Sequence, residues 1–228
     1  MNRRLFLSTG IAGLVPAFPA PDADDADESP VLAPATAEVL FDGGSLAAWV
    51  GDKQDTPPWK LENGYVEVVP GAGSMRTREE FRDFQLHLEF RIPEDPGRAR
   101  GNSGVYLQNK YEVQIMDSFG QPPEFNGCGS LYREVAPARN ASKRPGRWQC
   151  FDIAFRMPRF DEGASEPREK GRLTVFHNRV LIHNNLQIPG MTGQAKRNPK
   201  NDPRQPGPIL LQNHGSAVRF RNIWIVRV

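Results

Sequence analysis

The sequence predicts an all-β domain, a two-sheet antiparallel β-sandwich with Greek-key or jelly-roll connections. Apolar and polar residues alternate with a period of two in segment after segment, as in strands with one buried face. Glycine and proline each occur 21 times in 228 residues, and hydrophobic residues make up only 38 %. This composition is typical of many short strands and long loops. No segment keeps a helical period beyond one turn at 77–83, so a sandwich is the expected fold.

The expected strands follow one another through the chain. In Phe84–Ile92, apolar side chains occupy every second position, and Trp148–Arg156 repeats the pattern. His177-Asn178-Arg179 predicts a tight turn between two strands. A proline-rich segment, 189–208, cannot be a central strand, and a loop of this length is either disordered or part of a ligand site. The full set is Tyr65–Val69, Phe84–Ile92, Gly104–Leu107, Tyr111–Asp117, Trp148–Arg156, Arg172–His177, Val180–Asn184, Ile209–Asn213 and Val218–Val228.

Two short regions precede the expected domain at 37–228. Residues 1–17 contain Arg3 and Arg4 followed by a weakly apolar run that is too short for a membrane span. This arrangement predicts a twin-arginine signal peptide and export to the periplasm or cell exterior. Residues 18–36 are rich in acidic residues, proline and alanine, which predicts a solvated, disordered linker.

The charge balance excludes one class of partner. The chain has 29 Lys and Arg against 27 Asp and Glu, and removal of Arg3 and Arg4 leaves 27 of each. We therefore expect no nucleic-acid partner. Two cysteines, Cys128 and Cys150, do not make a disulfide scaffold, and the sequence favours neither a pair nor two free thiols.

The most informative segment is a pair of expected strands joined by a turn at 108–110. Along the second strand, Val113 and Ile115 point to one side, while Glu112 and Gln114 point to the other, exposed side. Such a face can bind a polyhydroxylated ligand or transfer a proton. From the pattern alone, it is more typical of a solvated sheet face, with cross-strand pairs worth under about 1 kcal/mol each.

Glu89 and Arg91 join this face if the two strands are neighbours, and would then add an oxyanion clamp. Laminarinase-type sandwiches carry two catalytic carboxylates on one strand and perform retaining hydrolysis. Here the strand from Glu112 to Met116 carries one carboxylate, because Gln114 and Met116 stand at the other positions. This excludes an ordinary retaining glycosidase built on that strand.

Three histidines and one loop are further candidates. His214, beside Gly215, is either an acid, base or ligand-binding residue or a turn histidine bonded to backbone. His177 and His183 flank the expected hairpin and are more typical of structural positions. In a glycine-rich loop, Tyr132 and Arg133 can stack on or bind a sugar ring, or simply belong to a connecting segment.

A series of motifs in a fixed order resembles the 3-keto-disaccharide hydrolase domain family, over roughly Val39 to Val228. The family has a concanavalin A-like sandwich fold. The motifs are Leu40-Phe41-Asp42-Gly43-Gly44-Ser45-Leu46, Trp59-Lys60-Leu61-Glu62-Asn63-Gly64, Phe81-Arg82-Asp83-Phe84, Asn102-Ser103-Gly104-Val105-Tyr106, Tyr111-Glu112-Val113-Gln114-Ile115, Cys128-Gly129, Pro145-Gly146-Arg147-Trp148, His177-Asn178 and Phe220-Arg221-Asn222-Ile223-Trp224. Two departures replace an aspartate of the family by its amide, at Asn184 and Asn213, and 130–133 also differs from the usual pattern.

The resemblance implies cleavage of glycosides whose sugar has been oxidised at C3, with a companion oxidoreductase as the expected source of that oxidation. The C3 ketone acidifies the C2 proton, so one base can start elimination of the C1 leaving group before water adds back. We expect Glu112 to be the base, and Arg91 or a bound divalent cation to stabilise the enolate.

The remaining roles follow from the same resemblance. Either His214 or Tyr132 would protonate the leaving oxygen. The residues expected to bind substrate are Asn102, Gln114, Gln212, Glu89, Tyr132 and Arg133. The alternatives are a lectin-like carbohydrate-binding module on the same fold and, less favoured, a matrix or surface protein.

Overall fold

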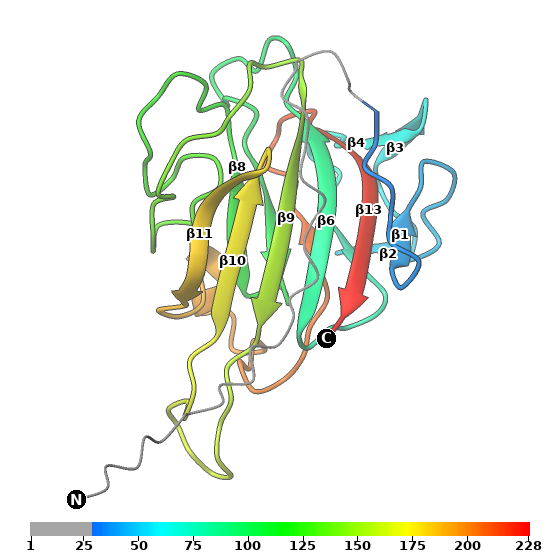
Figure 1. Cartoon of the computed structure of the whole chain (residues 1–228). Helices are drawn as coiled ribbons and strands as arrows, with labels where there is room; N and C mark the ends of the chain where they lie inside the picture. Colours follow the sequence, from blue (N-terminus) through cyan, green and yellow to red (C-terminus); the bar gives the residue numbers. More distant parts are fainter. Residues whose placement is uncertain (1–28) are drawn as a thin grey trace, which may run out of the picture.

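The computed structural model describes residues 29–228 and confirms the expected two-sheet antiparallel sandwich (Figure 1). One sheet has eight strands and the other has five. The described residues contain no α-helix, only a short 3₁₀ helix, η1, at Gly193–Arg197. The single expected helical turn at 77–83 is absent, because residue 77 ends a strand and the chain then bends. No described helix is long and apolar enough to cross a membrane.

The eight-stranded sheet has the order β11-β10-β9-β6-β13-β4-β3, and β1 also pairs with β13. β1 pairs with positions 223–225 of β13, whereas β4 pairs with positions 219 and 220, so both lie along the same edge of β13. The bounds are β1 Glu38–Phe41, β3 Lys60–Glu62, β4 Tyr65–Glu67, β6 Phe84–Arg91, β9 Trp148–Arg156, β10 Arg172–His177, β11 Val180–Gln187 and β13 Arg219–Arg227.

The five-stranded sheet has the order β2-β5-β12-β7-β8. Its hairpin of β7 and β8 turns at Gln108 and Asn109, which both have positive φ, and Lys110 N donates to Leu107 O at 3.0 Å. The expected turn at 108–110 is therefore confirmed. The bounds are β2 Trp49–Gly51, β5 Met75–Thr77, β7 Ser103–Leu107, β8 Tyr111–Ile115 and β12 Leu210–Leu211.

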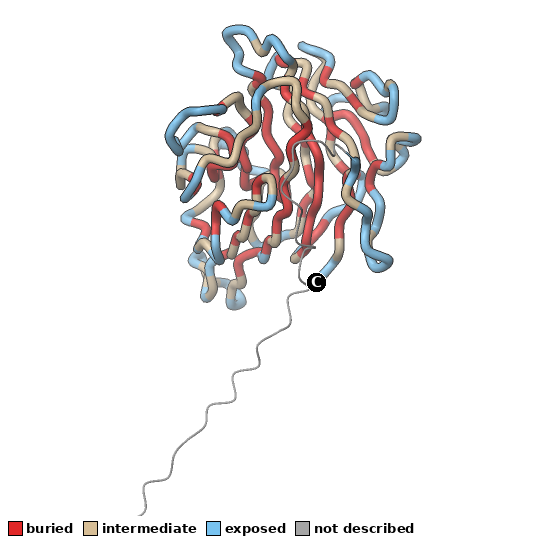
Figure 2. Tube along the Cα trace, turned by 45° about the horizontal axis from the view of Figure 1, so that its top comes forward, coloured by how far each residue is buried: buried red, intermediate tan, exposed pale blue. Residues whose placement is uncertain are grey.

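The hydrophobic core lies between the two sheets. Buried residues form continuous runs along the central strands, and exposed ones gather in the loops (Figure 2). The alternation in β6 places Phe84, Leu86, Leu88 and Phe90 in this core, as the sequence predicted. The bounds of β9 and β10 match the prediction. The short strands β1, β2, β3 and β5 were missed, because three or four residues carry too little alternation to be recognised.

The predicted signal peptide lies outside the described residues, as does most of the predicted linker. The last part of that linker contacts the domain, because Val31 N donates to Glu89 Oε1 at 3.0 Å and Val31 O accepts from Asn222 Nδ2 at 2.8 Å. Both cysteines, Cys128 and Cys150, are free.

Candidate active site

The strand pairing of β7 and β8 builds a polar site on the outer face of the five-stranded sheet. Tyr106 lies directly opposite Glu112, and Gly104 lies opposite Gln114. Because side chains alternate along a strand, these four positions share the face that points away from the core. β12 pairs with β7 and continues into Gln212, which adds a fifth residue to this face.

The site is buried, whereas the sequence predicted an exposed face. Glu112 is 2 % exposed and Gln114 is 1 % exposed. Two loops cover the free edge of β8: Tyr132 N donates to Glu112 O at 3.0 Å, and Glu112 N donates to Thr192 Oγ1 at 2.8 Å. The loop 189–208 is therefore ordered next to Glu112, and its expected part in a ligand site stays a prediction.

The Glu112 carboxylate is held by a directed chain of donors. Gln212 Nε2 donates to Tyr106 Oη at 3.3 Å, and Tyr106 Oη donates to Glu112 Oε2 at 2.7 Å. Burial raises the pKa of Glu112 to about 7, although Tyr106 and the charge of Arg133 act to lower it. Burial and the nearby carboxylate raise the pKa of Tyr106 well above its ordinary value, so its hydroxyl remains a donor.

Two glycines lie close to the carboxylate, and one of them, Gly104, leaves the space that it occupies. A Cβ at Gly104 would lie 2.5 Å from Glu112 Oε1, so a side chain there would displace the carboxylate. A Cβ at Gly193 would lie 3.6 Å from Glu112 Oε2 and 3.5 Å from Tyr132 Cδ1, and Gly193 has a φ of +46°. The start of η1 thus lies over the carboxylate with no side chain between.

A second chain of contacts leads from Glu112 to the surface. Gln114 lies within hydrogen-bonding distance of Glu112 Oε1, at 3.0 Å, and of Asn102, at 2.9 Å. Asn102 lies 3.2 Å from Nδ1 of the exposed His214. Four residues expected to act together, Glu112, Gln114, Asn102 and His214, therefore form one connected group.

Tyr132 and Arg133 lie at the rim of the same site. The Arg133 guanidinium stacks over the Tyr132 ring at 5.2 Å, and its charge acts on Glu112. Arg133 adopts a positive φ of 60°, and its N–H donates to Phe125 O at 2.8 Å. Arg133 is thus a cation at the rim of the site, and its charge acts on the Glu112 carboxylate.

Two expected site residues, Glu89 and Arg91, do not belong to this group. They lie on β6, in the eight-stranded sheet, whereas Glu112 lies on β8 in the other sheet. The condition that the two strands are neighbours is not met. Glu89 instead accepts from Arg221 Nε at 2.6 Å and from Asn222 Nδ2 at 2.8 Å. Burial alone would raise the pKa of Glu89, but bonds from His87, Asn222 and Arg221 outweigh it and lower the pKa.

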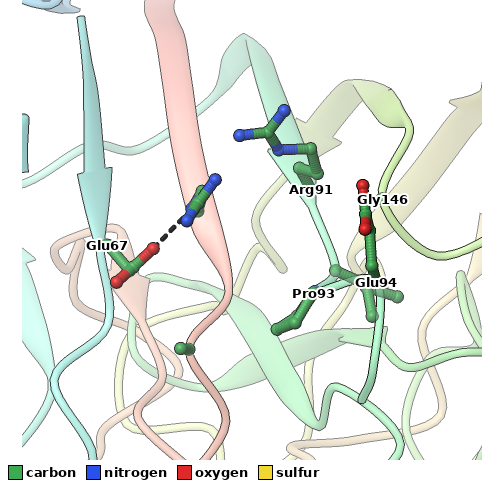
Figure 3. Close-up of a pocket in the computed structure, with 8 residues that line it drawn as sticks. Glu67, Arg91, Pro93, Glu94 and Gly146 are labelled. Atoms are coloured by element: carbon green, nitrogen blue, oxygen red, sulfur yellow. Dashed lines mark hydrogen bonds and ion pairs between the residues drawn. The ribbon is translucent and has the colours of Figure 1, made fainter. Parts of the chain in front are cut away.

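Arg91 lines a separate open pocket of about 340 Å³ on the outside of the eight-stranded sheet. Its guanidinium stacks over the rings of Trp148, at 4.9 Å, and Tyr65, at 5.8 Å. Across the pocket, Glu67 forms an ion pair with Arg219 (Figure 3). Arg91 therefore has aromatic neighbours of its own and no place beside Glu112.

The other candidates are structural. His177 Nε2 lies 3.0 Å from Gln149 Oε1, and His183 Nε2 donates to Gly129 O at 2.8 Å, both in buried positions. Asn213 Nδ2 donates to Val69 O at 2.7 Å and Gly73 O at 3.1 Å. An aspartate could not donate these bonds, which accounts for the amide. Within residues 29–228, no group of three or more His, Cys, Asp or Glu side chains is arranged to hold a metal ion.

Sequence reasoning missed Tyr106 and Thr192. The position of Tyr106 could have been predicted, because a turn at 108–110 places residue 106 opposite Glu112 on the same face. Thr192 had no such signal, since it comes from an irregular loop far along the chain.

The chain as a whole matches a family model. The model of the 3-keto-alpha-glucoside-1,2-lyase-like domain matches residues 36–226. The chain belongs to this family. A "putative glycosyl hydrolase" of Parabacteroides distasonis is similar to it at 36 % identity and a TM-score of 0.78, over 86 % of this chain and 85 % of that one.

Two further solved structures share the fold at lower sequence identity. Another protein of P. distasonis with the same description has 17 % identity and a TM-score of 0.63, over 85 % of this chain and 94 % of that one. The alginate lyase Aly36B has 11 % identity and a TM-score of 0.53, over 85 % and 97 %. At such identities the likeness concerns the fold alone. A comparison with curated proteins finds no match.

Proposed function

We propose that this protein is a carbohydrate-active enzyme that cleaves 3-keto-glycosides or 3-keto-disaccharides by elimination across C1 and C2, followed by addition of water. One observation carries the proposal: the site has a single buried carboxylate, Glu112, whose pKa of about 7 suits a general base at neutral pH. Within residues 29–228, the side chains that contact this carboxylate are those of Tyr106 and Gln114, which are neutral, and the charge that acts on it is that of Arg133. Membership of the 1,2-lyase-like family supports the same chemistry.

The first step removes a proton. The Glu112 carboxylate takes the C2 proton, and the electron pair of that C–H bond forms an enolate with the C3 ketone. Arg133 takes the stabilising role first expected of Arg91, because its charge reaches Glu112 while Arg91 lies on the other sheet. Gln212, with Asn102 and Gln114, supplies amides that bind the sugar hydroxyls.

The second step breaks the glycosidic bond. The enolate re-forms the ketone, a double bond forms between C1 and C2, and the leaving oxygen departs with a proton from His214 or Tyr132. Water then adds its oxygen to C1 and its proton returns to the acid. Glu112, whose proton has exchanged with solvent after the alcohol leaves, protonates C2. The net reaction is hydrolysis, with each protein group restored.

The setting of the reaction follows from the substrate. A 3-keto sugar must be made by oxidation of a C3 hydroxyl, so a sugar 3-oxidoreductase has to act before this protein. The twin-arginine pattern of residues 1–17 supports activity outside the cytoplasm.

A substrate panel tests the function. The mature chain is incubated with 3-keto-glucosides and with the same glucosides carrying a C3 hydroxyl, and release of the aglycone is followed. We expect release from the keto forms alone. Saturable binding of sugar without release would instead support the lectin-like module, and release from both forms would contradict the role of the ketone.

A further inference from the structure

We propose that Asn102 and Gln114 form a reversible amide relay, through which the protonation of Glu112 and that of His214 Nδ1 depend on each other. The relay comprises three contacts: Glu112 Oε1 to Gln114 at 3.0 Å, Gln114 to Asn102 at 2.9 Å, and Asn102 to His214 Nδ1 at 3.2 Å. A carboxamide has one donor arm and one acceptor arm of nearly equal shape, so a half-turn exchanges them. The relay therefore has two possible directions.

Ionised Glu112 admits one direction only. Its Oε1 can only accept, so Gln114 Nε2 donates to it, and also to Ser103 O at 3.3 Å. Gln114 Oε1 then requires a donor, which is Asn102 Nδ2. Asn102 Oδ1 now faces His214, so His214 must carry a proton on Nδ1. The ionised base and a protonated Nδ1 occur together.

Protonated Glu112 admits the reverse direction. Its hydroxyl donates to Gln114 Oε1, and Gln114 Nε2 donates to Asn102 Oδ1 at 2.9 Å. Asn102 Nδ2 then donates to His214 Nδ1, which must be without a proton. This direction gives up the bond from Gln114 to Ser103, so it is favoured only while Glu112 has a proton to donate.

Other groups around Glu112 leave this connection intact. Tyr106 on β7 donates to Oε2, and Arg133 in the covering loop acts by its charge. Gly104 provides no side chain on the Oε1 side, where its Cβ would lie 2.5 Å from that oxygen. Oε1 is therefore left to Gln114, and Asn102 is the described side chain that connects it to His214.

The use of the relay in turnover rests on the proposed function. Before elimination, the base must be ionised and a histidine acid must be doubly protonated, which the first direction favours. After elimination, the base carries a proton and His214 has given its Nε2 proton to the leaving oxygen. The second direction is then reached when the proton that remains on Nδ1 moves to Nε2 through solvent. Asn102 and Gln114 are thus positioning residues that link the two proton transfers.

Nuclear magnetic resonance of the full chain tests the relay without any substrate. Histidine labelled with ¹⁵N reports the protonation of His214 Nδ1 against pH, and glutamate labelled with ¹³C reports the carboxyl of Glu112. His214→Gln and Glu112→Gln spectra provide the assignments. We expect the protonation of His214 Nδ1 to change in a step at the pH where Glu112 ionises.

Matched variants test whether the coupling between Glu112 and His214 passes through Asn102. Asn102→Leu should remove the His214 step at the Glu112 midpoint, whereas Gln212→Leu, on the other side of the carboxyl, should retain it. Asn102→Asp can only accept, so it should hold a proton on His214 Nδ1 across the range. Thermal unfolding checks that each variant is folded, and Asn102→Ala replaces Asn102→Leu if that variant is not.

Two results would overturn the relay: a wild-type His214 with no step at the Glu112 midpoint, or a step that persists in Asn102→Leu. The readout is independent of turnover. Absence of the step in the wild-type chain, with sugar cleavage intact, would therefore refute the relay alone. A wild-type step without any sugar cleavage would refute the proposed function alone.

Discussion

Replacement of Glu112 by glutamine has two effects that the structure links. Glutamine keeps the shape, accepts from Tyr106 at the position of Oε2, and can donate to Gln114 at the position of Oε1. It cannot accept a proton from carbon, so turnover of a 3-keto-glucoside should vanish. The same change should stabilise the folded chain at alkaline pH, because it removes a buried charge.

The magnitude follows from the pKa of the carboxyl. In the folded chain this pKa is raised by burial to about 7, from an ordinary value of 4.5. The protonated form therefore favours folding below about pH 4.5, and this contribution is lost as the pH rises through 7. At 1.36 kcal/mol per pKa unit, the loss is about 3 kcal/mol. For a domain of this size it corresponds to a shift in Tm on the order of 6–12 °C.

Thermal or urea unfolding of wild-type and Glu112→Gln chains at pH 4 and pH 8 measures the effect. The gain of the variant over wild type should be about 3 kcal/mol larger at pH 8 than at pH 4. Comparison of the two pH values cancels any change in hydrogen bonding common to both. An equal difference in stability between variant and wild type at both pH values would refute the inference that burial raises the pKa of Glu112. Retained turnover would refute its role as base.

Three further changes test the site from other sides. Tyr106→Phe removes the donor to the base, so the acidic limb of kcat/KM, which should rise through about pH 7, should move to higher pH; an unmoved limb would exclude this contact. Gly104→Ala should abolish turnover, because its Cβ would lie 2.5 Å from the carboxylate, while the matched Gly190→Ala, with open space around it, should leave turnover unchanged; comparable activity of both would contradict the geometry. Arg133→Met should reduce kcat by roughly 100-fold, as expected for loss of an oxyanion-stabilising group, and Arg91→Met should not; the reverse result in kinetic assays would restore the arrangement first expected from the sequence.

The sequence predicted the face on which Glu112 and Gln114 lie, because strand alternation depends only on neighbouring residues. The turn at 108–110 adds Tyr106 by simple counting along a hairpin. Gln212 and His214 reach the site because β12 pairs with β7. That pairing joins segments more than 100 residues apart, and no local pattern reports it.

Glu89 and Arg91 show why the same reasoning failed elsewhere. They alternate with apolar residues just as Glu112 does, but alternation identifies a face of one strand and not the sheet to which the strand belongs. The burial of Glu112 was also missed, because irregular loops cover it. Thr192 and Gly193 reach the carboxylate through a segment with no periodic pattern.

Isotope incorporation at C2 tests the central claim, that one carboxylate acts by removing the C2 proton of a keto sugar. A 3-keto-glucoside with protium at C2 is cleaved in D₂O, and the released sugar is reduced at once with borohydride to stop spontaneous exchange. Free 3-keto-glucose without protein serves as the control. We predict one deuterium at C2 of the product beyond that of the control. Cleavage with the C2 protium fully retained would contradict the elimination and the role assigned to Glu112.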